Sequence, residues 1–181
     1  MIDSYIRAGK IVSKIRSDAS EMIKEGCLVL DLVEYVEGEI LKQDAGIAFP
    51  CNVSINEVAA HYTSPINDKT VIHAGDMVKL DLGAEVDGCI ADSAVTILAG
   101  GNIDENYTQD EINLHEEIVE ASEAGLEAAI ATALVSEPPL PRVVILSYLL
   151  TPWKPATITI FFLSSSFLIL SESTVLILAM P

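Results

Sequence analysis

Two aspartates in a stretch of alternating residues are the side chains of this sequence best suited to chemistry. Asp81 and Asp92 flank the dipeptide Asp87-Gly88, which favours a two-residue type I′ turn between antiparallel strands. The register set by that turn places Asp92 opposite Gly83 and diagonally beside Asp81. Diagonal neighbours on one face of a hairpin lie roughly 5.5 to 8 Å apart, so the two carboxyl groups are expected within reach of each other.

Two carboxylates at such a distance repel each other unless a cation lies between them or one takes up a proton. Oxygen ligands suit hard or borderline divalent metals, so the pair predicts a bridged dinuclear metal site. The alternative is that Asp81 and Asp92 are both solvated on an exposed face of the sheet, and spacing alone favours this alternative. Asp87 is interpreted as a turn residue without a catalytic role.

The hairpin that must position these aspartates has one strongly apolar face. With Val86 paired to Cys89, the pleat sends alternate residues of both strands to the same side. That side holds Val78, Leu80, Leu82, Ala84, Val86, Cys89, Ala91, Val95 and Ile97, with Ser93 its only polar member. We therefore expect this face to pack on the core and the aspartates to lie on the other face.

Two helices are expected before the hairpin. The first is capped by Asp3 or Ser4, carries apolar residues at helical spacing and stops near Gly26. The second covers about residues 30–43. The chain is therefore an α/β unit.

Glycine and proline interrupt residues 45–64, which predicts a loop, a short strand and a tight chain path. A third helix is expected from Thr108, because Thr108 and Glu111 have the spacing of a capping box.

The histidines carry a weaker signal than the aspartates. His61 lies within the segment Ala-Ala-His-Tyr-Thr, and a lone histidine next to a tyrosine is by default a satisfied, partly buried side chain. His73 and His115 are interpreted as surface residues. The sequence contains no nucleophile elbow, phosphate loop or dinucleotide fingerprint that would indicate a different chemistry.

Charge and cysteine usage limit the partners and the compartment. The formal net charge of −17 argues against a nucleic-acid partner, since an acidic surface repels phosphate. The three cysteines show no paired spacing, and the charged N-terminus has no apolar core of a signal peptide, so a cytoplasmic protein is expected. These cysteines are Cys27, Cys51 and Cys89.

The composition changes sharply near residue 135. We divide the chain into residues 1–134 and an apolar, nearly uncharged tail at 135–181 that opens with a proline cluster. A shifted reading frame or a truncated gene product explains the tail better than a membrane anchor, although residues 155–171 form an uncharged stretch of borderline spanning length. Membrane binding is therefore not expected.

The segments 49–65 (FPCNVSINEVAAHYTSP) and 75–96 (GDMVKLDLGAEVDGCIADSAVT) closely resemble type II methionine aminopeptidases, the archaeal and eukaryotic-like branch. The similarity runs from about residue 6 to about residue 132. It implies the pita-bread (creatinase/aminopeptidase-like) fold, two similar αβ halves around a central antiparallel sheet, of which this chain contains only the N-terminal half.

The resemblance also implies a site and an activity. Asp81 corresponds to a ligand of one metal ion and Asp92 to the bridging ligand of two. His61 corresponds to a catalytic and substrate-binding histidine, and Phe49 to a wall of the methionine pocket. The implied enzyme is a mostly monomeric metalloprotease that uses two divalent ions (cobalt, manganese, iron, zinc or nickel) to remove the initiator methionine from nascent proteins.

Three further ligands of the resembled family, one histidine and two glutamates, have no counterpart in this sequence. After residue 133 there is no histidine, and Glu137 and Glu172 lie outside the family's motifs. We therefore expect this chain alone to be inactive. The alternatives to an incomplete aminopeptidase are a non-catalytic pita-bread binding protein and a truncated product without function.

Overall fold

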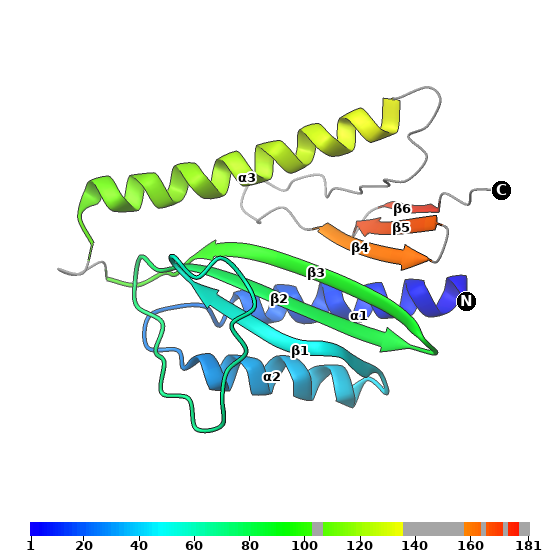
Figure 1. Cartoon of the computed structure of the whole chain (residues 1–181), viewed down its shortest axis with the longest axis horizontal. Coiled ribbons are helices and arrows are strands. Elements are labelled where there is room, and N and C mark those ends of the chain that lie inside the picture. The colour runs from blue at the N-terminus through cyan, green and yellow to red at the C-terminus, as the bar shows by residue number, and fades with distance from the viewer. Residues whose placement is uncertain (103–106, 136–157, 164–165, 172–173, 178–181) are drawn as a thin grey trace.

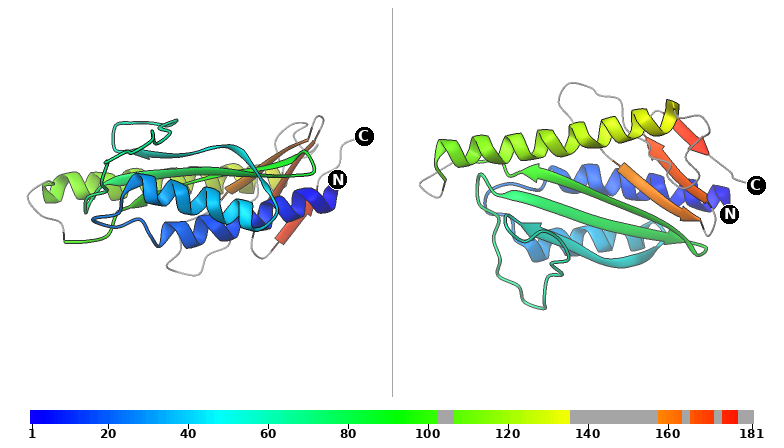
Figure 2. Two further views of the ribbon diagram at one scale, coloured as in Figure 1. Left: turned by 90° about the horizontal axis from the view of Figure 1, so that it is seen from below. Right: turned by 45° about the horizontal axis from the view of Figure 1, so that its top comes forward.

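The computed structural model describes residues 1–102, 107–135, 158–163, 166–171 and 174–177, with side chains up to residue 128. An antiparallel sheet carries two helices on one face (Figures 1 and 2). The elements in chain order are α1 (Ile2–Ser20), α2 (Val29–Lys42), β1 (Gly46–Ile55), β2 (Met77–Val86), β3 (Cys89–Leu98), α3 (Gln109–Val135), β4 (Ile158–Leu163), β5 (Ser166–Ser171) and β6 (Thr174–Ile177). The described strands lie in the sheet in the order of their numbers, so each pairs with its neighbour in sequence.

The β2–β3 hairpin confirms the predicted register. Val86 pairs with Cys89, and Gly83 pairs with Asp92. The turn residues Asp87 and Gly88 have φ values of 53° and 79°, the left-handed pair that a type I′ turn needs. The turn chemistry of one dipeptide was therefore sufficient to assign each residue of the hairpin to a face.

The apolar face of the hairpin packs on the core, as expected, with α1 against β2 and β3, while α2 packs against the neighbouring β1. Leu80 and Leu82 are fully buried there, together with Ile15 of α1 and Leu32 of α2. Burying a side chain of this size contributes roughly 1.5 to 3 kcal/mol, so a few such residues outweigh any single polar contact in the molecule.

Ser93, the polar exception on the core face, has a buried partner that the sequence did not indicate. The Arg16 guanidinium of α1 donates a hydrogen bond from Nη1 to Ser93 Oγ at 2.7 Å, and both residues are buried. A buried hydroxyl without a partner is costly, so this bond explains how the face tolerates a serine.

The ends of α1 differ from the expectation. The helix begins at Ile2 with Met1 as its N-cap, and Ser4 instead donates its hydroxyl to Asp87 Oδ2 at 3.0 Å. It ends at Ser20 rather than near Gly26, because the next residues turn away and Glu25 N–H donates to the Gly100 carbonyl at 2.9 Å. Tertiary contacts therefore redirected residues that the local pattern had assigned to the helix.

Residues 45–64 were predicted as a loop with a short strand, but β1 is a ten-residue strand. Its pairing with β2 shifts register twice, once before Phe49 and once between Phe49 and Asn52. Pro50 lies in the second irregularity, where its missing N–H does not break the ladder. Cys51 N–H there donates to Glu37 Oε1 of α2 at 3.0 Å.

The capping box of α3 is confirmed. Glu111 N–H donates to Thr108 Oγ1 at 3.3 Å, and Thr108 N–H donates to Glu111 Oε2 at 2.8 Å.

Among the residues that the structure describes, no helix has the length and apolar character to cross a membrane. The stretch 155–171 is only partly described, and its residues 155–157 and 164–165 lie outside the described ranges.

Candidate metal and peptide site

Asp81 and Asp92 meet on the face of the hairpin opposite the core. Both are partly buried, and their carboxyl groups are hydrogen-bonded to each other. Burial, then the charge of Asp81 and the hydrogen bond to it, raise the pKa of Asp92 to about 6. Burial also raises the pKa of Asp81, although the hydrogen bond from Asp92 and the nearby His61 oppose that rise. The two groups thus compete for a proton as adjacent carboxylates do when no cation separates them.

This carboxylate pair fits a divalent metal ion by its donor chemistry. Each oxygen is a hard ligand, and a cation between them would relieve the repulsion that now favours protonation. Within the described ranges, no set of three or more histidine, cysteine, aspartate or glutamate side chains is placed to hold a metal ion. If Asp81 and Asp92 bind a metal ion, the described part of the chain provides two ligands, fewer than a closed metal site needs.

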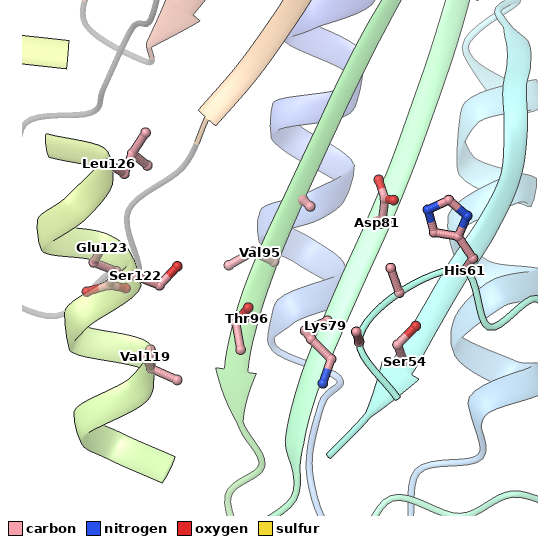
Figure 3. A pocket seen from close by; sticks show the side chains of 13 residues that line it. Ser54, His61, Lys79, Asp81, Val95, Thr96, Val119, Ser122, Glu123 and Leu126 are labelled. Atoms are coloured by element: carbon pink, nitrogen blue, oxygen red, sulfur yellow. The ribbon is translucent and has the colours of Figure 1, made fainter. Parts of the chain in front are cut away.

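His61 lies in the long connection between β1 and β2 and points toward Asp81 (Figure 3). It is exposed, and its backbone is left-handed with a φ of 66°. Histidine is one of the few residues other than glycine found in this region, and such strain is concentrated at functional sites. The sequence alone favoured an ordinary satisfied histidine, whereas the structure brings it to the same cleft as Asp81.

Phe49 of β1 lies beside the aspartate pair because its ring covers Gly83. A Cβ atom at Gly83 would lie 2.4 Å from Phe49 Cε1, well inside van der Waals contact. Gly83 is paired with Asp92, so the absent side chain lets an aromatic ring approach a carboxylate ligand position. An apolar wall next to polar groups is the usual composition of a small-ligand site.

The cleft next to Asp81 has a volume of about 330 Å³ and three walls (Figure 3). Strands β2 and β3 form the floor, the loop at Ala59–His61 forms one side and α3 forms the other. The α3 side consists of Val119, Ser122, Glu123 and Leu126. Nothing in the sequence marked these residues as part of a site, since their approach to β3 depends on the path of the chain between them.

Lys79 was also missed, although a signal existed. It lies two residues before Asp81 on the same strand face and therefore lines the same cleft. Its ammonium group donates a hydrogen bond to the Asn56 carbonyl at 2.5 Å, and burial lowers its pKa. The predicted register had already placed Lys79 on the aspartate face, but no role in the site was assigned to it.

The remaining histidines and Asp87 lie away from the aspartate pair. His73 is exposed, as expected, and its N–H donates to Asp76 at 2.8 Å. His115 is partly buried rather than a surface residue, because its Nδ1 lies 3.0 Å from the Gly75 carbonyl and its ring meets Tyr107 edge-on. Asp87 is the turn residue that the sequence indicated.

Comparison with known proteins places this fold and site in a family. The model of metallopeptidase family M24 matches residues 3–137. A methionine aminopeptidase of Methanothermobacter thermautotrophicus is 50% identical over 132 residues, which cover 73% of this chain and 41% of the relative. That of Methanothermus fervidus is 45% identical over 132 residues, covering 72% of this chain and 70% of the relative.

A solved structure supports the same assignment. The methionine aminopeptidase of Thermotoga maritima superposes with a TM-score of 0.59 and 27% identity over 71% of this chain and 51% of its own. The chain belongs to metallopeptidase family M24 and has its pita-bread fold. It spans 41% of the length of the M. thermautotrophicus relative, so only part of such a protein is represented here.

Proposed function

We propose that this chain is the N-terminal half, residues 1–134, of a metal-dependent methionine aminopeptidase that removes the initiator methionine from nascent proteins. The observation that carries the proposal is the pair of partly buried aspartates on the outer face of the hairpin, of which Asp81 lines the cleft that also contains His61. The names of the relatives support the reaction, and the family supports divalent metal ions.

Each side chain has a distinct role in this proposal. Asp81 would be a ligand of one metal ion and Asp92 a ligand of both, and the hairpin keeps both carboxylates on one face of the sheet. When bound, the metal ions lower the pKa of a water molecule and polarise the peptide carbonyl. His61 donates a hydrogen bond near the scissile amide, and Phe49 covers the methionine side chain with its ring.

The substrate is a peptide that begins with methionine, and cobalt, manganese, iron, zinc and nickel are the candidate metals. We place the protein in the cytoplasm because its three cysteines are free in the structure and nascent chains are found there. The assignment of residues 135–181 to an apolar tail, explained by a shifted reading frame or a truncated gene product, stays a prediction, although its described strands β4 to β6 continue the sheet beside β3.

This chain alone is expected to have little or no activity. The described residues supply two carboxylate ligands, and each missing ligand weakens metal binding and leaves the site less ordered. The same observation favours a second candidate, a non-catalytic family member that binds a partner through this face. The two candidates differ in whether the aspartate pair binds metal at all.

Metal titration of the pure chain separates these candidates. We expect manganese or cobalt to bind weakly by calorimetry, with binding lost in Asp92→Asn. Asp87→Asn is the matched control, because it removes the same charge from the same hairpin while Asn-Gly keeps the type I′ turn. Equal metal binding by Asp92→Asn and the parent chain would contradict the proposed site. Release of methionine from a Met-Ala-Ser peptide would contradict the expected inactivity.

A further inference from the structure

His61 is held in an unusual conformation by very few contacts of its own. Its φ of 66° is unfavourable for an L-residue, and residues Glu57 to His61 are all exposed. An exposed loop without anchors samples several backbone conformations, so something next to His61 must select this one. The anchor lies on the C-terminal side, at Tyr62.

Tyr62 is fastened to β1 through its backbone. Its N–H donates to Ser54 Oγ at 3.2 Å, and its carbonyl accepts a hydrogen bond from Val53 N–H at 3.0 Å. The next residue continues the attachment, since Thr63 Oγ1 donates to Asn52 Oδ1 at 2.8 Å. These bonds fix where the chain leaves His61, but they do not fix the rotation of the Tyr62 side chain.

The side chain of Tyr62 is held separately, by a hydrogen bond from its phenol to Asp68. The hydroxyl donates to Asp68 Oδ2 at 3.0 Å, and the ring packs against the core. Asp68 is only 7% exposed and accepts three more hydrogen bonds, from Ser64 Oγ at 2.9 Å, Thr70 N–H at 2.9 Å and Thr70 Oγ1 at 2.7 Å. The two bonds from Thr70 to Asp68 Oδ1 would be enough to form the local turn. Asp68 Oδ2 accepts instead from Ser64 and Tyr62, which precede it in the chain.

We infer that Asp68 is a positioning residue, which acts through the Tyr62 hydroxyl to hold His61 in its left-handed conformation facing Asp81. The inference rests on the proposed function for the importance of His61. The physical link is short: Asp68 locks the side chain of Tyr62, Tyr62 is bonded to β1 on both sides of its Cα, and His61 is the preceding residue. Without the bond to Asp68, the phenol keeps only its contact with Thr70 Oγ1 at 3.3 Å and its packing against the core, so Tyr62 is held less firmly and the strained backbone of His61 can relax.

The chain contains a matched control for this link. Tyr107 also donates its hydroxyl to a buried carboxylate, Asp76 Oδ1, at 2.5 Å, and Asp76 is 3% exposed. Tyr107 precedes α3 and contacts His115 rather than His61. The Tyr107 hydroxyl also accepts a hydrogen bond from Asn56 Nδ2 at 2.7 Å, at the N-terminal end of the connection that carries His61. Tyr107→Phe therefore removes the same chemical group from the N-terminal end of this connection, whereas the inference assigns the order of His61 to the C-terminal end, at Tyr62.

The test is the backbone order parameter of the His61 amide in the full chain, measured by ¹⁵N relaxation without metal. A rigid backbone has a value of about 0.85 and a flexible one falls below about 0.6. We expect Tyr62→Phe and Asp68→Asn each to lower the His61 value below about 0.6 while the Asp81 amide stays rigid, and Tyr107→Phe to leave His61 unchanged. Unchanged His61 order in both variants, or an equal loss in Tyr107→Phe, would overturn the inference.

Ser64→Ala is the milder variant if the first two unfold. It removes one donor to Asp68 and leaves the phenol in place, so a partial loss of His61 order is expected. A folded Ser64→Ala protein with full His61 order would then overturn the inference. Broadening of the His61 ring signals by manganese tests the proposed function separately, because the order parameters are measured without metal. Ordered His61 without broadening would reject the metal site and leave the positioning intact.

Discussion

The ten residue pairs of the β2–β3 hairpin alternate between its two faces, and these faces are stabilised in opposite ways. The inner face is apolar and buried mainly against α1, and its single serine is bonded to Arg16. The outer face brings together two carboxyl groups whose pKa values are raised by burial, because their charged forms are less well solvated there than in water. The inner face therefore supplies stability and the outer face the capacity for chemistry, so removing a buried side chain from the inner face and removing a carboxylate from the outer face should change stability in opposite directions.

The largest effect is expected on the inner face. Leu82→Ala removes a fully buried side chain and leaves a cavity, so it should lower the free energy of unfolding by about 2 to 5 kcal/mol. Urea denaturation followed by circular dichroism measures the loss. An effect below about 1 kcal/mol would mean that the hairpin does not pack on the helices as described.

Gly83→Ala is the next largest change, because it adds a methyl group where the outer face meets Phe49. The new Cβ would clash with the ring, so we expect a loss of about 1 to 3 kcal/mol and a displaced Phe49. Gly38→Ala in α2 is the control, since nothing lies within 4 Å of its Cβ position. That variant should gain up to about 1 kcal/mol in the same urea denaturation, because alanine favours a helix over glycine.

Asp92→Asn should stabilise the metal-free chain at neutral pH. The folded-state pKa of Asp92 is raised from 3.8 to about 6, so its protonated form is favoured by folding. The stability that protonated Asp92 contributes to the folded state is fully present below pH 4 and is lost as the pH rises through 6. The gain in the variant should therefore be roughly 1 to 2 kcal/mol at pH 7 after solvent screening and vanish below pH 4.

Denaturation of both proteins between pH 3 and 8 measures this profile. A constant difference between Asp92→Asn and the parent chain at every pH would show that ionisation of Asp92, which burial and then the charge of Asp81 disfavour, is not the source of the difference. A variant less stable than the parent at pH 7 would show that the carboxylate, rather than being strained, has a favourable partner in the folded state.

Asp87→Asn should have the smallest effect, within about 0.5 kcal/mol of zero. Asparagine suits the left-handed turn position as well as aspartate does, and its amide oxygen can still accept the Ser4 hydroxyl. The thermal midpoint should hardly move. A large loss would mean that the turn charge, and not only the packing of the inner face, contributes to the hairpin.

The hairpin was predictable because its interactions are local. One dipeptide sets the turn, the turn sets the register, and the register assigns Asp81 and Asp92 to the face opposite the core. The capping box at Thr108 was predictable for the same reason, since both partners lie within one helical turn. The roles of His61, Phe49, Asp81 and Asp92 came from family resemblance and stay predictions.

The features that sequence reasoning missed join residues far apart in the chain. Arg16 meets Ser93, β1 extends through Pro50 because β2 tolerates its irregular register, and α3 supplies a wall of the cleft. The backbone strain at His61 also escaped notice, since it depends on how Tyr62 is held. The spacing of apolar residues along the sequence carries no information about contacts between such distant residues.

The sequence by itself determined the apolar face of the hairpin, the placement of two carboxylates on the other face and the start of α3, because each depends on residues only a few positions apart. The tertiary structure alone decided that Phe49 covers Gly83, that His61 faces Asp81 and that α3 closes one side of the cleft. These arrangements require separate elements to pack together, and their geometry is set by the shape of the whole core rather than by any local pattern.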